Sequence, residues 1–271
     1  YESDEDIKLV GDALPFSLKL IESLLAETPR HKGLLLAACK GFTTYAYAYV
    51  QQEGDVVAET DIIEGNKIRT RSRKLYLRGY EYCQRGMEIP YRGVTERLFR
   101  EPKTALAATK KKDVPLLYWS AASLGLAISV SRGDAAMLAR LPEVDALIGR
   151  AIELNEGWED GSLHEFQVTL AGAKPGSRDY DAIRKHYQRA LELSGGKYAS
   201  LYVAYAEAVT IPKQDRAGFR DLLEKGLAVD VDRHKEIRLT NLVAQRRAQW
   251  LLDRTDDLIF ALEPEAPPDD Q

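Results

Sequence analysis

Apolar residues recur at intervals of three and four along most of this chain, the spacing of one face of an α-helix. No segment shows the sustained alternation of apolar and polar residues that is typical of a half-buried strand. Proline and glycine interrupt the pattern often, and helices joined by short turns pack antiparallel. The sequence therefore predicts an all-α fold of helical hairpins. The predicted helices cover 14–26, 34–52, 67–87, 114–130, 144–154, 157–170, 179–193, 198–209, 214–229 and 235–257, with stops at Pro29, Gly54, Pro90, Pro102, Gly133, Pro142, Pro175, Gly195–Gly196 and Pro212.

An internal repeat refines this picture. The run Arg-Ala-Ile-Glu-Leu at 150–154 matches Arg-Ala-Leu-Glu-Leu at 189–193, and each has a glycine at the eighth place. The 39-residue separation is typical of tetratricopeptide-type units with short insertions. Ala151 and Ala190 are the small residues that such units need where two helix axes cross, and Gly41, Gly79 and Gly125 suit the same close packing. We expect one solenoid-type domain over 13–260, with tails at 1–12 and 261–271 that are too polar to fold.

Composition narrows the classes of function. Of the 271 residues 45% are hydrophobic and 30% are charged, and the net charge of −4 offers no basic field for a nucleic-acid backbone. The longest uncharged run, 114–130, contains a proline and is short for a bilayer crossing. Because the chain begins at Tyr1 without an initiator methionine, we expect that an export signal or a tag has been removed.

The two cysteines, Cys39 and Cys83, each lie in an apolar helical stretch. Two cysteines are too few for a disulfide framework or a zinc site. Buried thiols are the simpler interpretation, whereas one disulfide between them would fit an oxidising compartment. The sequence leaves both open.

Catalytic motifs are missing from the sequence. The four histidines His31, His164, His186 and His234 are scattered without metal-ligand spacing or a carboxylate at helical reach, so each is interpreted as a surface or packing residue. The turn Ser-Gly-Gly-Lys at 194–197 is too short for a phosphate loop and is interpreted as a helix stop. We therefore predict a protein that is not an enzyme and has no cofactor and no metal.

Aromatic residues give the strongest hint of a binding site. Tyr45 and Tyr49 share one helix face, Tyr76 and Tyr80 repeat that geometry, and Tyr118 and Trp119 begin a later helix. A tyrosine combines an apolar ring with a hydroxyl that needs a partner, so such a set suits a ligand or partner cleft. We predict a cleft lined by these six, with Lys197 and Arg246 at its mouth. Ordinary packing between helices is the alternative for each tyrosine.

Five segments together resemble the T-component family of TRAP transporters: Gly-Phe-Thr-Thr-Tyr-Ala-Tyr-Ala-Tyr-Val at 41–50, Val-Pro-Leu-Leu-Tyr-Trp at 114–119, Glu-Asp-Gly-Ser-Leu-His at 159–164, Glu-Leu-Ser-Gly-Gly-Lys at 192–197 and Ala-Gln-Arg-Arg-Ala-Gln-Trp-Leu-Leu at 244–252. The resemblance covers about 11–260. It implies a tetratricopeptide-like fold, a periplasmic lipoprotein, a homotrimer and a cleft that passes a small organic or hydrophobic ligand to the transporter's solute-binding component. The family's lipidated cysteine is not in this chain, so the implied anchor would lie upstream of Tyr1.

The leading hypothesis is therefore a non-catalytic accessory scaffold of a TRAP-type transport system. One alternative is a cytosolic peptide-docking scaffold of the co-chaperone kind, which grips a terminal carboxylate with repeated Lys and Asn residues. The chain has only Asn66, Asn155 and Asn241, and no repeated pair is found. A third hypothesis, an enzyme with a site built from distant helices, would need a pocket of groups with shifted pKa values.

Overall fold

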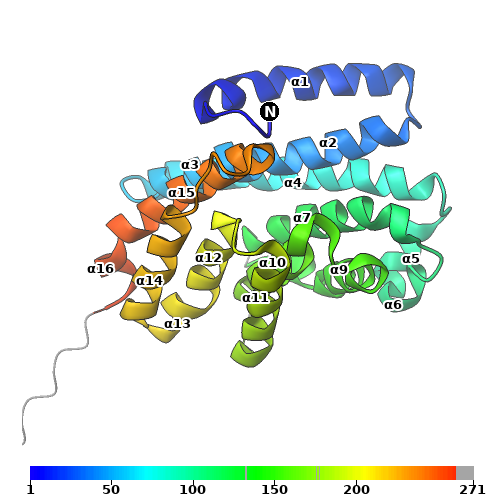
Figure 1. Cartoon of the computed structure of the whole chain (residues 1–271). Coiled ribbons are helices and arrows are strands. Elements are labelled where there is room, and N and C mark those ends of the chain that lie inside the picture. The colour runs from blue at the N-terminus through cyan, green and yellow to red at the C-terminus, as the bar shows by residue number, and fades with distance from the viewer. Residues whose placement is uncertain (132, 175, 177, 261–271) are drawn as a thin grey trace, which may run out of the picture.

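The computed structural model describes residues 1–131, 133–174, 176 and 178–260, and all regular elements within these ranges are helices (Figure 1). The main helices are α1 (Ile7–Glu27), α2 (Lys32–Tyr45), α4 (Ile62–Glu88), α7 (Val114–Ser129), α9 (Leu141–Asn155), α10 (Ser162–Ala173), α11 (Tyr180–Ser194), α12 (Ala199–Tyr205), α14 (Arg216–Leu227) and α15 (Arg238–Asp253). Shorter α-helices are α3 (Gln52–Val57), α5 (Val94–Arg100), α6 (Pro102–Ala105), α8 (Ala135–Leu138), α13 (Ile211–Lys213) and α16 (Thr255–Leu258). The all-α prediction is confirmed, although the short helices α3, α5, α6, α8 and α13 were not predicted.

Five short helical segments depart from α geometry. Two are π-helices, η1 (Ala46–Gln51) and η4 (Ala206–Thr210), and three are 3₁₀-helices, η2 (Lys111–Asp113), η3 (Trp158–Gly161) and η5 (Lys235–Ile237). Both π-helices lie within longer helical paths, since η1 joins α2 to α3 and η4 joins α12 to α13. A π-helix holds an extra residue per turn, which rotates the side chains after it relative to a regular helix.

Aspartates begin many of these helices. The carboxylates of Asp6, Asp61 and Asp179 accept hydrogen bonds from backbone amides in the first turns of α1, α4 and α11. An aspartate at this position satisfies amides that have no partner inside the helix. The cap at Asp6 explains one error of the sequence-based prediction, which began the first helix at Leu14 and left 1–12 as a tail. Residues 7–12 are helical, and the predicted tail at 261–271 lies outside the described residues.

Glycines mark both helix ends and close contacts. Gly195 and Gly196 end α11 with φ of 62° and 77°, a left-handed conformation that suits glycine, so the predicted helix stop is confirmed. Gly54 was predicted to be a stop and is not. It lies inside α3, where an added Cβ would approach the backbone nitrogen of Arg69 on α4 to 3.2 Å. The predicted stop at Pro175 lies outside the described residues.

A disulfide joins two of the central helices. Cys39 on α2 and Cys83 on α4 are bonded, and both are fully buried. Gly79 lies one turn before Cys83, where an added Cβ would come within 2.8 Å of the Thr43 hydroxyl and 3.1 Å of the Cys39 carbonyl. The predicted close-packing role of this glycine is therefore confirmed, and of the two states left open for the cysteines the structure has the disulfide.

The helices follow one another in antiparallel order and curve until the end of the chain returns to its beginning (Figure 1). The largest apolar core is formed by α4, α7, α9 and α10, around Leu117, Leu124 and Leu147. A second core joins α12, α14 and α15. Where α15 returns to α1 and η1, the apolar contact is small and centres on Val10, Ala48 and Val243. The two ends of the fold thus meet across a minor apolar cluster.

No helix within the described ranges is both long and apolar enough to cross a membrane.

Candidate functional site

The curve of the chain borders a cavity of about 760 Å³ that opens to solvent. Its walls come from α7, α10, α12 and α15 and from the path α2–η1–α3 with the start of α4. None of the lining residues belongs to α9, α11 or α14, the second helices of the later hairpins, as far as the described residues show. The first helices of these hairpins therefore face inward, as expected for a curved stack of helical hairpins.

The two π-helices face this cavity with related sequences. Tyr47 lies between two alanines in η1, and Glu207 lies between two alanines in η4. Both side chains line the cavity. Burial and the charge of Glu207 raise the pKa of the Tyr47 hydroxyl to about 12, so it stays protonated at neutral pH. π-Helices are common at functional sites because they redirect side chains, and here both of them contribute polar groups to one wall.

A network of charged side chains crosses the cavity wall where α15 meets α3 and η4. Asp55 pairs with Arg69 at 2.9 Å and with Arg247 at 2.8 Å, and Arg247 also pairs with Glu207 at 2.7 Å. Arg247 lies over the ring of Trp250, with 4.2 Å from the guanidinium carbon to the ring centre. Burial lowers the pKa of Arg247, but the charges of Glu207 and Asp55 outweigh it and raise that pKa overall. Two acids and two cations neutralise one another here.

The opposite wall is aromatic and apolar. Tyr118 and Trp119 at the start of α7 meet edge to face with ring centres 5.1 Å apart, and Phe166 of α10 meets Tyr118 at 6.1 Å. Leu126 and Ala122 continue this wall along α7. Such geometry is favourable between aromatic rings and leaves ring faces and edges open to a ligand.

Glu165 lies beside these rings on α10 and is partly buried in the cavity wall. Burial raises the pKa of its carboxyl to about 7, although a hydrogen bond from the Ser200 hydroxyl works in the opposite direction. Among the described residues no cation forms an ion pair with this carboxylate, since it belongs to none of the salt bridges. Sequence reasoning did not find Glu165.

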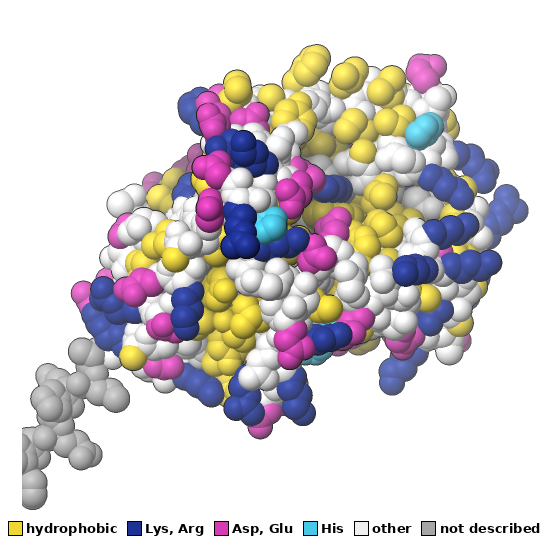
Figure 2. All heavy atoms as spheres, in the orientation of Figure 1, with side chains coloured by type: hydrophobic (Ala, Val, Ile, Leu, Met, Phe, Trp, Pro, Cys, Tyr) yellow, Lys and Arg dark blue, Asp and Glu magenta, His cyan; other side chains and the backbone are white. Residues whose placement is uncertain are grey.

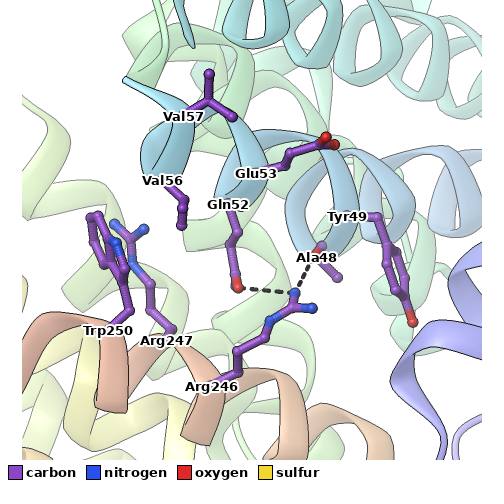
Figure 3. A pocket seen from close by; sticks show the side chains of 9 residues that line it. All are labelled: Ala48, Tyr49, Gln52, Glu53, Val56, Val57, Arg246, Arg247 and Trp250. Carbon is purple, nitrogen blue, oxygen red and sulfur yellow. Dashed lines mark hydrogen bonds between the residues drawn. The ribbon is translucent and has the colours of Figure 1, made fainter. Parts of the chain in front are cut away.

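A smaller pocket of about 350 Å³ adjoins the charged network between η1, α3 and α15, and Arg247 and Trp250 line both this pocket and the large cavity (Figure 3). Figure 3 shows Arg246 reaching from α15 toward this path, where its guanidinium donates to the Ala48 carbonyl and, at 3.1 Å, to the Gln52 amide oxygen. Trp250 and Val56 form the far side of the pocket. Arg246 thus ties the end of the fold to its beginning.

The structure brings some of the predicted site residues together and separates others. Tyr118 and Trp119 line the large cavity, and Tyr49 and Arg246 line the smaller pocket. Four predicted residues line neither: Tyr45, Tyr76, Tyr80 and Lys197.

These four have other contacts. Tyr76 donates to Gln51 at 2.6 Å, Tyr80 donates to Glu143 at 3.1 Å, and both rings are buried. Tyr45 stacks on Tyr49 with ring centres 5.7 Å apart, and Lys197 pairs with Asp160 at 2.6 Å. The spacing of four residues correctly placed each pair of tyrosines on one helix face. It could not show whether that face lines the cavity or packs against the neighbouring helix.

Two of the histidines, which the sequence analysis interpreted as scattered, are in contact with each other. The Nδ1 atoms of His164 on α10 and His186 on α11 lie 2.7 Å apart, and His164 Nε2 lies 3.0 Å from the Glu156 carboxylate. Glu156 is in turn held by two hydrogen bonds of 2.9 Å from Arg189. The interpretation of His164 as lacking a companion carboxylate was therefore wrong, because the partner comes from the preceding helix end. Within the described residues no three or more His, Cys, Asp or Glu groups are placed to hold a metal ion.

The sequence of this chain matches the family model described as "TRAP transporter T-component" over residues 3–259. The chain belongs to that family. This match confirms the family resemblance, and a T-component is an accessory part of a transport system. An uncharacterized protein of Treponema pallidum (strain Nichols) is 27% identical to this T-component over 266 residues, which cover 96% of this chain and 82% of the relative.

Proposed function

We propose that this T-component is a non-catalytic scaffold in the periplasm that docks the solute-binding component of a TRAP transporter and holds or passes a small organic or hydrophobic ligand. The observation that carries the proposal is a cavity of about 760 Å³ inside a member of a transporter family. A volume in this range suits a small molecule, and the mixture of aromatic walls with a few polar groups is typical of ligand sites.

The proposal includes a tetratricopeptide-like architecture. Its support is the repeated hairpin, in which α7, α10 and α12 line the cavity while α9, α11 and α14 stand behind them. The repeat residues Ala151 and Ala190 are both buried, with 0% and 1% of their surface exposed, as small residues at helix crossings should be. An experimental structure with a regular rotation from hairpin to hairpin is the direct test.

The buried disulfide supports the periplasmic location. Disulfides persist in oxidising compartments and are rare in the cytosol, so the Cys39–Cys83 bond favours the periplasm over the cytosolic co-chaperone alternative. The proposed lipid anchor would be attached upstream of Tyr1. Fractionation of cells that express the natural protein should find it with the periplasmic or membrane-attached proteins, and a purely cytosolic pool would contradict this.

An apolar stripe on α1 supports the proposed homotrimer. Leu9, Phe16, Leu20 and Leu24 lie on one helix face and are 59%, 74%, 50% and 46% exposed. Figure 2 shows apolar side chains in a row along its upper edge, over α1. A contiguous exposed apolar face commonly marks an interface. Light scattering should find a trimer for the wild type and a smaller species for Phe16→Glu, whereas a wild-type monomer at tens of micromolar would contradict the proposal.

Binding in the cavity is tested with N-phenyl-1-naphthylamine, an apolar dye that fluoresces when it leaves water. The full chain should bind it, and Leu126→Trp should abolish the signal because the larger ring fills the cavity wall. Phe99→Trp on α5 is the control, because it is exposed and lies outside both the cavity and the proposed trimer face, and it should bind normally. Equal binding by both variants would place the dye elsewhere.

Docking is tested by mixing the purified T-component with the solute-binding component of its own transporter. Co-elution in size-exclusion chromatography supports the scaffold role. Failure to associate at tens of micromolar, with or without solute, would contradict it.

A further inference from the structure

The charge balance of the large cavity depends on one side chain. Asp55 and Glu207 are compensated by Arg69 and Arg247 through three ion pairs. Glu165 is the remaining charged group among the described lining residues, and no cation is paired with it. When Glu165 is ionised the cavity therefore carries one uncompensated negative charge, which is costly in a partly buried place unless a ligand supplies the opposite charge.

The polar groups that interact with Glu165 are hydroxyls, from Ser200 and from three tyrosines. Its charge adds to burial in raising the pKa values of three tyrosine hydroxyls from three different elements. Glu159 of η3 also raises the pKa of Tyr118 by its charge. Two cations near this end have other partners: Lys197 pairs with Asp160, and Lys40 of α2 pairs with Glu2 while lying over the Trp119 ring, 5.7 Å from its centre. The titratable and polar neighbours of Glu165 are Tyr47 of η1, Tyr118 of α7, Glu159 of η3, Tyr198 before α12 and Ser200 of α12.

Aromatic rings adjoin the same carboxylate. Tyr118, Trp119 and Phe166 form the wall next to Glu165, and Tyr47 and Trp250 line the cavity with them. The face of an aromatic ring attracts a cation through its quadrupole, most strongly where water is excluded. A single carboxylate beside several rings is thus complementary to a positively charged group on an apolar body.

From this juxtaposition we propose that the cavity selects a small organic cation, an amine or quaternary ammonium with an apolar or aromatic body, whose charge pairs with Glu165. The inference rests on the proposed function, because it requires that the cavity holds a ligand. It adds the charge of that ligand and the residue that recognises it. Ion pairing also favours the ionised carboxylate, so a bound cation lowers the pKa of Glu165 and binding strengthens with rising pH.

The test uses three indole probes that differ in charge: tryptamine, its neutral alcohol analogue indole-3-ethanol, and the anion indole-3-propionate. Calorimetry on the full chain at pH 8 should find tryptamine bound about tenfold more tightly than the alcohol, with the anion weakest. Equal affinities, or a preference for the anion, would overturn the inference. This comparison needs no variant, so it remains decisive if a substitution prevents folding.

Two substitutions then assign the effect to one carboxylate. Glu165→Gln should lose the preference for tryptamine, about tenfold, while binding of the neutral alcohol stays within about twofold. Glu159→Gln is the matched control, an exposed acid nearby that does not line the cavity, and it should keep the preference. If Glu165→Gln keeps the preference, or Glu159→Gln loses it equally, the assignment to Glu165 is wrong.

The pH dependence gives an independent readout. Binding of N,N,N-trimethyltryptammonium, whose charge does not titrate, should strengthen several-fold from pH 5.5 to 8 in the wild type and stay flat in Glu165→Gln. A flat wild-type profile would contradict the inference. Failure of this inference alone would appear as dye binding in the cavity without charge selection, whereas failure of the proposed ligand role would appear as no binding of any probe, the dye included.

Discussion

Arg247 on α15 and Asp55 on α3 form an ion pair of 2.8 Å across 192 residues of sequence. Their side chains are only 14% and 12% exposed. Since the apolar contact between the two ends of the fold is small, this pair and the neighbouring bond from Arg246 to the Ala48 carbonyl supply polar contacts that close the ring around the cavity.

Replacing Arg247 with methionine should therefore open or weaken this closure. The substitution leaves Glu207 and one oxygen of Asp55 without their cation in a partly buried place, and we expect a loss of about 3 kcal/mol in the free energy of unfolding. Urea denaturation followed by circular dichroism measures it. Arg100→Met is the control, because the Arg100–Glu96 pair is 72% and 70% exposed and should contribute little. A loss no larger than the control's would mean that the pair does not hold the ring.

Two tyrosines should respond in opposite ways to loss of the hydroxyl. Tyr76→Phe removes a buried donor and leaves the Gln51 oxygen unpaired, so it should cost about 1–3 kcal/mol of stability and leave probe binding unchanged. Tyr118→Phe should leave stability nearly unchanged but weaken binding of a probe that contacts its hydroxyl in the cavity. Thermal melts and calorimetry on both variants check this. If Tyr118→Phe loses stability without a change in binding, its hydroxyl serves packing alone.

The disulfide should contribute substantially to stability. Cys39 and Cys83 are separated by 44 residues, and a cross-link over a loop of that length is expected to stabilise by about 4 kcal/mol at most. The double variant Cys39→Ala, Cys83→Ala should unfold at lower urea concentration and be insensitive to dithiothreitol. Wild-type protein should shift toward the variant when reduced. Identical wild-type midpoints with and without reductant would exclude a stabilising role.

The His164–His186 contact should make stability depend on pH. Burial first, and the charge of His164 second, lower the pKa of His186, so the folded state binds a proton less readily than the unfolded chain does. Stability is then fully present above the unfolded value of about 6.5 and falls as pH decreases below it. Glu165 changes stability in the opposite direction over the same pH range, so the measurement is the difference in stability between wild type and His186→Gln, which should become less favourable to the wild type from pH 7.5 to 5.0. Glu156 changes little in this range, because its contribution is lost only as pH falls below the unfolded value of about 4.5.

Glu165 should have the opposite dependence. Its folded pKa of about 7 lies above the ordinary value of 4.5, so its contribution to stability is present below pH 4.5 and lost as pH rises through 7. A shift of this size corresponds to about 3 kcal/mol. Glu165→Gln should therefore match the wild type at pH 4.5 and exceed it at pH 8 in urea denaturation. A constant difference between the two proteins across this range would show that Glu165 ionises normally.

The helices with strong local signals were predictable. The prediction 114–130 agrees with α7 and 179–193 with α11, because Pro115 near the start of one and Gly195 after the other mark ends by local backbone chemistry. The start of α1 was missed, because Asp6 caps the helix eight residues before the predicted start at Leu14 and Pro15 lies inside it.

The site was predictable only in part. Tyr118 and Trp119 were predicted as site residues because two adjacent aromatic residues at a helix start are visible in the sequence alone, and both line the large cavity. Arg247 was not, because its ion pair depends on α15 returning to α3, and Glu165 was not, because its burial depends on the packing of α10 beside α7 and α12; local periodicity encodes neither contact. Tyr47 was passed over because the i, i+4 rule assumes a regular helix, whereas η1 is a π-helix that alters which side chain faces inward.

The helix that supplies the last wall of the cavity, α15, is also the last long helix to be synthesised. A chain made from its amino end forms the aromatic wall of α7 and the carboxylate of Glu165 long before it makes Arg247 and Trp250. Until then the cavity lacks the wall that α15 supplies. If the cavity binds a ligand as proposed, binding would require that α15 has docked, so a binding assay would also measure the fraction of completed protein.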